Sequence, residues 1–316
     1  MDGHRVRAEA GVVSTPEGPV EKTADARRAA YAEGARRNRS IVWAKFRRNR
    51  LAALSAVVVI ALLLLAIFAP WVAPRDPLYI DMAQKFAKPG EAGFLLGADE
   101  LGRDILSRLL HAGRVSLSVG LMTALIAVIV GSILGALAGY YGGAIDAAIM
   151  RLVDILLSMP TIFLLLALAA FLKPTLFTIT LIIGLNSWMS VARMVRGQIL
   201  SLKQQEFILA ARALGAGDRR LIFRQLLPNA FAPVLVAATL NVATAILLES
   251  SLSYLGFGIQ PPTASWGNML NNAQTYVLYA PWVAVYPGFM ITVTVLSFNF
   301  AGDGLRDALD PRLSVS

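Results

Sequence analysis

Residues Leu51–Ala69, LAALSAVVVIALLLLAIFA, form an apolar run that contains no charged side chain and ends at Pro70. A helix needs roughly 20 apolar residues to cross the hydrocarbon core of a bilayer, which is about 30 Å thick. The run therefore predicts a transmembrane helix. It begins too far into the chain and is too long for the apolar part of a secretory signal peptide, so we expect it to remain in the protein.

Five further apolar runs of similar length follow along the chain. They are Val115–Ile145, in which the span ends near Gly139, then Ile155–Leu172, Thr175–Ala192, Phe231–Leu248 and Val283–Ala301. The whole chain is 56% hydrophobic and only 16% charged, against about 25% charged residues in an ordinary soluble domain. The predicted fold class is therefore all-α, a polytopic membrane protein with six transmembrane helices.

The connection before the last span, Gly256–Pro281, is uncharged but does not read as a span. Asn268 and Asn271 disfavour burial in lipid, whereas Trp266 and Tyr276 suit a membrane interface. We expect an external loop that contains a short interfacial helix.

Lysine and arginine gather before the first span and between the fourth and fifth spans. The positive-inside rule then places both termini in the cytoplasm. Residues 1–40 lack an apolar period and are predicted to be a disordered basic tail. Ile41, Trp43 and Phe46, interspersed with basic residues, favour a short juxtamembrane surface helix; a simple charge cluster that sets the topology is an equal alternative.

The connection between spans four and five contains an amphipathic segment. Phe207, Ala210, Ala211 and Leu214 follow a spacing of i, i+3, i+4 and i+7, which places them on one helix face. Gly215 and Gly217 are expected to end this helix, and Asp218 to cap a second one. Such a helix either receives a partner protein or lies flat on lipid headgroups, and periodicity alone leaves both readings open.

Several kinds of chemistry are missing from the sequence. There is no cysteine, and the two histidines, His4 and His111, stand alone, so neither a thiolate site nor a histidine metal cluster is expected. A phosphate-binding P-loop requires lysine directly after glycine, and no lysine here follows a glycine. We expect no catalytic residues, no metal and no ATPase site in this chain.

The order Leu209-Ala210-Ala211, Gly215, Leu227-Pro228 resembles the Glu-Ala-Ala…Gly…Leu-Pro loop of binding-protein-dependent ABC permeases. Leu209 stands where that family usually has glutamate. Four further segments extend the resemblance over residues 41–312: Phe46–Leu51, Leu96–Arg108, Gly139–Gly143 and Glu249–Gly267. Together they are similar to the C-type permease subunit of dipeptide/oligopeptide importers.

The resemblance implies a type I ABC importer permease in the bacterial cytoplasmic (inner) membrane. We expect four divisions of the chain: the disordered tail 1–40, a juxtamembrane helix with the first span at 41–70, an external segment at 71–114, and a permease core at 115–312, whose loop at 203–227 is the coupling loop that the resemblance implies. The implied partners are a second, B-type permease subunit, cytoplasmic ATPase subunits that bind ATP and magnesium, and an extracellular solute-binding protein. No nucleic acid is expected.

In such permeases the loop docks into a cleft of the ATPase. The residues that match this role are Phe207, Leu209, Ala210, Ala211, Arg212, Leu214, Gly215, Leu227 and Pro228. Gly215→Asp, or a bulky residue at Ala211, is expected to abolish uptake and uncouple ATPase activity.

Polar residues within the fifth span are candidates for the substrate pathway. They are Thr239, Asn241, Thr244 and Glu249. An acid at membrane depth usually faces a cavity or a partner, but polar side chains in spans also form hydrogen bonds between helices. Both readings remain open for each of the four.

Three other features carry predictions. Gly131, Gly135 and Gly139 repeat every four residues, which favours close helix packing over a pathway lining. Pro160 is expected to bend the third span, and Arg151 to pair with Asp154 within it.

The dense charges before the second span suggest either a self-paired cap or a docking site for the binding protein. They are Asp99, Arg103, Asp104 and Arg108, of which the last two are expected to pair. The rival function for the whole chain is a self-sufficient secondary transporter or channel, although no internal repeat supports it.

Overall fold

The computed structural model describes residues 43–309, and all the regular structure in this part is helical. Residues 43–48 are helical, as predicted for the juxtamembrane segment, whereas the tail 1–40 and Ile41 lie outside the described residues. Residues from Phe46 onward form one compact unit. The description below concerns that unit.

Five helices are long and apolar enough to cross a membrane. They are α2 (Arg50–Ile67), α4 (Ile105–Tyr141), α7 (Leu176–Leu202), α11 (Phe231–Tyr254) and α13 (Trp282–Leu309). A sixth crossing exists if α5 (Gly143–Leu157) and α6 (Thr161–Phe171), which meet at an angle of 89°, count as one broken span. The prediction of six spans agrees with this arrangement.

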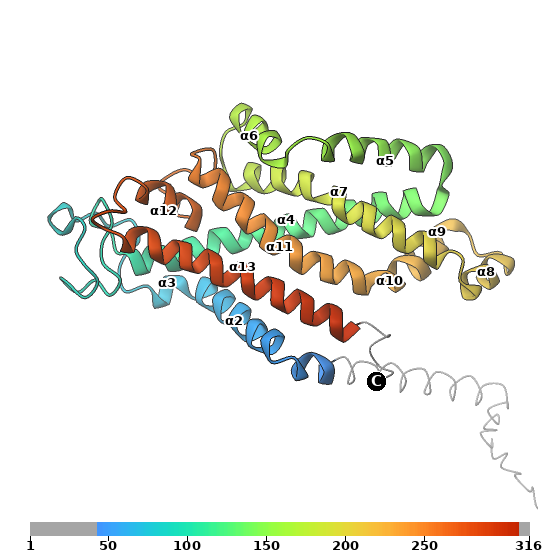
Figure 1. The fold of residues 1–316 in the computed structure, drawn as a ribbon, viewed down its shortest axis with the longest axis horizontal. Helices are drawn as coiled ribbons and strands as arrows, with labels where there is room; N and C mark the ends of the chain where they lie inside the picture. Colours follow the sequence, from blue (N-terminus) through green and yellow to red (C-terminus); the bar gives the residue numbers. More distant parts are fainter. Residues whose placement is uncertain (1–42, 310–316) are drawn as a thin grey trace, which may run out of the picture. The chain divides into compact units, whose positions relative to one another are not determined.

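The shorter elements lie in the connections. They are α3 (Ala69–Val72), η1 (Met82–Gln84), α8 (Glu206–Ala213), α9 (Asp218–Leu221), the π-helical turn η2 (Ile222–Leu226), α10 (Leu227–Asn229) and α12 (Trp266–Ala273). Residues 70–104 and α12 gather at one end of the bundle. The segment α8–α10 lies at the opposite end, together with the start of α2 and the end of α13 (Figure 1).

The charges before α4 form a buried, self-paired cap, which is the first of the two predicted alternatives. Asp99 receives ion pairs from Arg103 at 2.8 Å and from Arg108 at 3.3 Å, and all three side chains are nearly inaccessible. The expected pair between Asp104 and Arg108 is wrong. Asp104 instead caps α4 by accepting the Ser107 amide at 2.7 Å, which lets this helix begin at Ile105 rather than Val115.

The prediction that the Trp266 side chain lies at the membrane interface is wrong. This side chain is only 1% exposed, and its indole N–H donates to the Leu109 carbonyl of α4 at 3.1 Å. A capping box of Ser265 and Asn268 starts α12, as the local sequence Ser-Trp-Gly-Asn allows. The loop therefore closes the end of the bundle as part of its core.

The glycine repeat of α4 lies against α7, which confirms the packing prediction. A Cβ added at Gly131 would come within 2.6 Å of the Val191 Cβ, and one at Gly139 within 2.9 Å of the Ile199 Cβ. These glycines therefore allow the two helix backbones to approach closely, as small residues do in membranes.

Pro160 does interrupt the third crossing, as predicted, but that crossing begins earlier than the sequence suggested. Helix α5 already starts at Gly143 and carries charged residues that pair across to α7. Asp154 pairs with Arg193 at 2.8 Å, not with Arg151, and Asp146 forms a two-point ion pair with Arg196.

Candidate functional site

The amphipathic helix predicted between spans four and five is present as α8. Glu206 opens it, and Gly215, with a φ of +80°, stands directly after its last residues in a conformation that favours glycine. Leu214 is 89% exposed and Phe207 46% exposed. The inner side is anchored by Ile208, which is fully buried, so α8 presents an exposed apolar face while remaining attached to the bundle.

Of the four residues predicted to share one face of this helix, three are exposed. Phe207, Ala210 and Leu214 are exposed, whereas Ala211 is half-buried and packs on the same cluster as Ile208. Leu209 and Arg212 are also exposed. A bulky residue at Ala211 would therefore disturb internal packing as well as any docking surface.

Polar contacts fasten the segment after α8 to the end of α4. The Tyr140 hydroxyl donates to the Asp218 carboxylate at 2.5 Å, and the Arg212 guanidinium lies 5.6 Å from the centre of the Tyr140 ring. Lys203 donates to the Gly139 carbonyl at 3.0 Å. The prediction that Asp218 caps a helix is wrong. Gly217 holds the N-cap position of α9, and the Asp218 carboxylate accepts the hydrogen bond from Tyr140.

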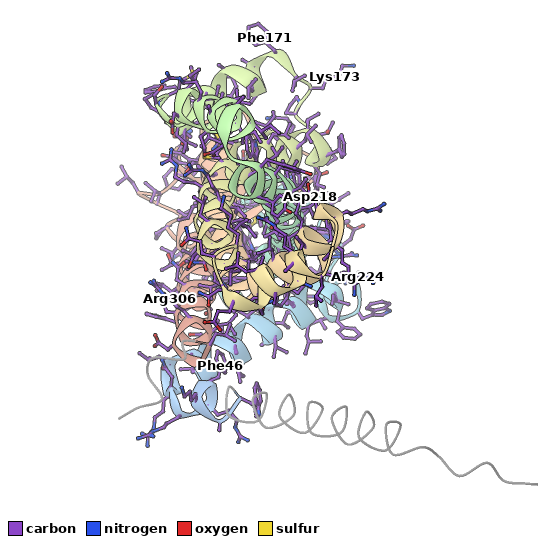
Figure 2. All side chains as sticks on the ribbon, turned by 90° about the vertical axis from the view of Figure 1, so that its right-hand side faces the viewer. Phe46, Phe171, Lys173, Asp218, Arg224 and Arg306 are labelled. Atoms are coloured by element: carbon purple, nitrogen blue, oxygen red, sulfur yellow. The ribbon has the colours of Figure 1, made fainter. Side chains whose placement is uncertain are left out.

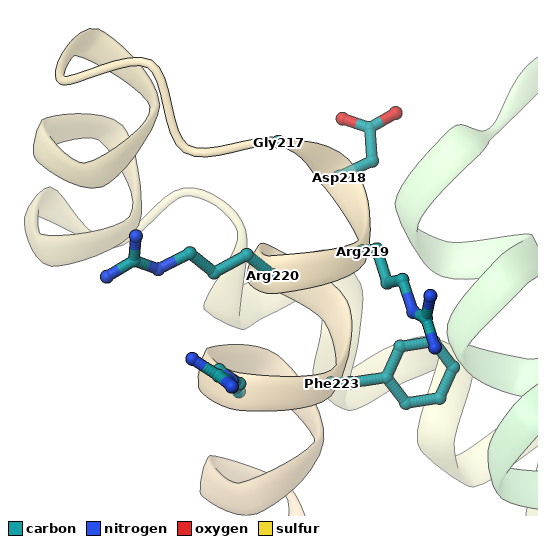
Figure 3. Close-up of a pocket in the computed structure, with 6 residues that line it drawn as sticks. Gly217, Asp218, Arg219, Arg220 and Phe223 are labelled. Atoms are coloured by element: carbon teal, nitrogen blue, oxygen red, sulfur yellow. The ribbon is translucent and has the colours of Figure 1, made fainter.

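A basic hollow of about 720 Å³ adjoins α9 and η2. Arg219 and Phe223 project to one side of the ribbon, and Arg220 projects to the other (Figure 3). Figure 2 looks at this end of the bundle, where Asp218, Arg224 and Arg306 are labelled. The chain then passes through Leu227 and Pro228 in α10 into α11, so α8 is connected to a long span by a short helical link.

Tyr140→Phe is expected to loosen the segment without unfolding the chain. The change removes the hydroxyl that holds Asp218, and loss of a hydrogen bond to a charged group costs about 1.5–3 kcal/mol. Amide hydrogen exchange should rise in residues 203–227 and stay unchanged in α12. Tyr141→Phe is the control, because Tyr141 is half-exposed and its hydroxyl forms no hydrogen bond within the described residues. Equal exchange in both variants would contradict the anchoring role.

A second cavity, of about 480 Å³, lies between the α5–α6 break, α7 and α11. It holds two of the four predicted pathway residues, Asn241 and Thr244. Sequence reasoning did not single out its other polar residues, which are Thr161, Asn186, Ser187 and Ser190. Their signal was their uncharged polar character at the middle of spans, which periodicity alone does not distinguish from interhelical bonding.

The other two predicted pathway residues lie elsewhere. Thr239 donates to the Val236 carbonyl and lies beside Gly302 of α13. Glu249 is fully buried and accepts hydrogen bonds from Ser253 at 2.7 Å and Ser116 at 3.2 Å. Ser116 also accepts the Trp266 amide, so Glu249 helps to join α4, α11 and α12. Neither residue contributes to the cavity wall.

Among residues 43–309 no three His, Asp or Glu side chains are grouped as metal ligands would be. An all-helical membrane bundle with a polar cavity at mid-span and an exposed amphipathic helix at one end has the architecture of a transport permease.

The comparisons with known proteins agree with this architecture. Residues 131–315 match the family described as "Binding-protein-dependent transport system inner membrane component". Residues 39–89 match the "N-terminal TM domain of oligopeptide transport permease C". The chain belongs to the family of binding-protein-dependent transport system inner membrane components, and the resemblance found in the sequence is confirmed.

Curated relatives cover most of the chain. The Di/tripeptide transport system permease protein DppC of Pseudomonas aeruginosa (strain UCBPP-PA14) is 42% identical over 86% of this chain and 91% of its own. The Oligopeptide transport system permease protein OppC of Bacillus subtilis (strain 168) is 39% identical over 85% and 88%. The Glutathione transport system permease protein GsiD of Shigella flexneri serotype 5b (strain 8401) is 45% identical over 86% and 89%.

A solved structure of the MetNI methionine ABC transporter in an inward-facing conformation shares the fold. The likeness has a TM-score of 0.53 at 22% sequence identity, and it covers 65% of this chain and 98% of that chain. The predicted type I permease fold is therefore confirmed.

Proposed function

We propose that this chain is the C-type permease subunit of an ATP-driven importer for peptides, and that it forms the pathway together with a second, B-type permease. Its relatives by name handle dipeptides, tripeptides, oligopeptides and glutathione. In this proposal, cytoplasmic ATPase subunits bind ATP and magnesium, and an extracellular solute-binding protein delivers the cargo.

The observation that carries the proposal is the exposure of α8. The apolar side chains of Phe207, Leu209 and Leu214 are exposed at this end of the bundle. A helix surface that faces water is usually polar, and an exposed apolar patch marks an interaction site. A partner protein with an apolar cleft would bury these side chains. The proposed contact set also includes Ala210 and Arg212, whereas Ala211 and Gly215 shape the helix and Leu227 and Pro228 lead into α11.

The contacts around α8 give a route for mechanical coupling. Ile208 packs with the ends of α4 and α7, Asp218 is held by Tyr140, and α10 leads into α11. The cavity lined by Asn241 and Thr244, which in this proposal is part of the pathway, lies between α7 and α11. A displacement of α8 by closing ATPases would therefore reach two of the cavity's walls through rigid helices, as alternating access requires.

The proposed orientation follows from the end at which α8 lies. If α8 meets cytoplasmic ATPases, the start of α2 and the end of α13 face the cytoplasm too, because all three lie at one end of the bundle (Figure 1). The capped end with residues 70–104 and α12 would then meet the binding protein.

The proposal is tested by purifying the chain from its native membranes and reconstituting it in vesicles. We expect the chain to co-purify with a second permease and ATPase subunits, and peptide uptake to require ATP, both permeases, the ATPase subunits and the binding protein. Peptide uptake by the lone chain, driven by an ion gradient, would contradict the proposal and support a secondary transporter.

A further inference from the structure

The cavity between α7 and α11 has no charged side chain among its lining residues. Its polar lining consists of hydroxyl and amide groups, and the rest is apolar. It lies near the middle of both helices, where the proposed function places the pathway. A cavity at this depth whose polar groups are all neutral has to select its cargo by hydrogen bonding, because fixed counter-charges are missing from its wall.

Most hydroxyl groups of this lining already donate their hydrogen to a backbone carbonyl of their own helix. Ser187 donates to the Ile183 carbonyl at 2.9 Å, and Ser190 donates to the Ser187 carbonyl at 3.1 Å. On α11, Thr244 donates to the Leu240 carbonyl at 3.0 Å. Each hydroxyl has a single hydrogen, so these three oxygens can only accept from a molecule in the cavity.

Asn241 adds a further acceptor. Its amide nitrogen donates to the Ala237 carbonyl at 2.8 Å, which orients the side-chain oxygen away from that carbonyl. One amide hydrogen of Asn241 remains free, and Asn186 makes no hydrogen bond within the described residues, so it can turn either way. The Thr161 hydroxyl likewise makes no hydrogen bond within the described residues. The lining therefore offers six side-chain oxygens as acceptors but only four unused hydrogens as donors, namely one on Thr161, one on Asn241 and two on Asn186.

From this imbalance we infer that the cavity is a passage site for hydrogen-bond donors, namely the ammonium group and amide N–H groups of a peptide, and that it disfavours anionic groups. The inference rests on the proposed function and specifies which part of the cargo the pathway holds. An ammonium group has three donors and no acceptor. The side-chain oxygens of the cavity can accept these hydrogen bonds.

The test introduces charge at Asn241 in the complex reconstituted from both permeases, the ATPase subunits and the binding protein. Uptake of a tripeptide with a free amino terminus is measured for Asn241→Asp, Asn241→Met and Asn241→Lys, normalised to the amount of assembled complex. Met and Lys have similar length, so their difference isolates charge. We expect the Lys variant to be roughly tenfold or more slower than the Met variant, because like charges repel at close range, and the Asp variant to be at least as fast as Met.

A second pair of variants examines a single acceptor. Thr244→Val removes one cavity oxygen and should slow uptake about threefold, which is under 1 kcal/mol by the tenfold-per-1.4 kcal/mol relation. Ser251→Ala is the matched control, since Ser251 lies on the same helix, donates to the Leu247 carbonyl at 2.8 Å and does not line the cavity. We expect Ser251→Ala to leave uptake unchanged.

The outcomes separate this inference from the proposed function. Equal rates for the Lys and Met variants, or an Asp variant slower than Met, would overturn the inference while uptake by the unaltered complex still supports a peptide permease. Absence of ATP-driven peptide uptake in the unaltered complex would instead refute the proposed function.

Discussion

Leu214→Asp is expected to lower ATP-driven uptake roughly tenfold or more while the chain still inserts and folds. Leu214 is 89% exposed at the end of α8, so its side chain contributes little to the fold of the subunit itself. Docking into an apolar cleft would bury it, and full burial of a leucine side chain is worth about 1.5–3 kcal/mol. An aspartate there loses this term and adds an unpaired charge, and every 1.4 kcal/mol is about tenfold in affinity.

The measurement is ATPase co-purification together with uptake in vesicles. Gln204→Asp is the control, because Gln204 is exposed in the same connection but precedes α8. Leu214→Asp is a cleaner test than Gly215→Asp, since Gly215 has a positive φ that strains any side chain whatever the partner. Full uptake by Leu214→Asp would refute docking through this face.

Gly135→Ala is expected to destabilise the permease strongly for so small a change. The new Cβ would come within 2.9 Å of the Val195 Cβ and still closer to the Ala192 carbonyl, so α4 and α7 would have to separate. Overpacking of a close contact costs about 1–3 kcal/mol. For a chain of this size that corresponds to a fall of roughly 2–10 °C in the melting temperature of the detergent-solubilised protein.

Gly197→Ala on α7 is the matched control for this prediction. A Cβ at Gly197 meets no atom within 4 Å, and alanine has a higher helix propensity than glycine by up to about 1 kcal/mol. The melting temperature should therefore stay level or rise. A fall of the same size in both variants would show that close approach at Gly135 is not what stabilises the α4–α7 pair.

The length of the apolar runs predicted the five unbroken spans, because a helix that crosses a bilayer needs an apolar surface along its whole length. The spacing of residues in the loop between spans four and five correctly located α8. The start of the third crossing was not predictable in the same way. Asp146, Arg151 and Asp154 end the apolar run in the sequence, yet two of them are neutralised by Arg196 and Arg193 on α7. Pairing between distant segments leaves no signal in local spacing.

The same limit explains the errors at the capped end. Trp266 has the composition of an interfacial residue, and only the tertiary structure shows Leu109 accepting its indole N–H. For the candidate site, the sequence located α8 through its period but could not tell that Ala211 turns inward. It predicted Asn241 and Thr244, which line the cavity, as pathway candidates, but it could not separate them from Thr239 and Glu249, because all four share one helix and the direction of each side chain depends on its neighbours.

The bend at Pro160 has a consequence for hydration. No backbone N–H of the described residues donates to the carbonyls of Ser158 or Met159, which lie within the break. Exposed peptide oxygens are not tolerated against lipid chains, and α6, with 11 residues, is only about 16 Å long and cannot complete the crossing alone. Leu157 and Thr161 on either side of the break line the polar cavity. Water that solvates these two oxygens would therefore keep the interior of the permease wet between transport cycles, so that a peptide entering it exchanges one hydration shell for another.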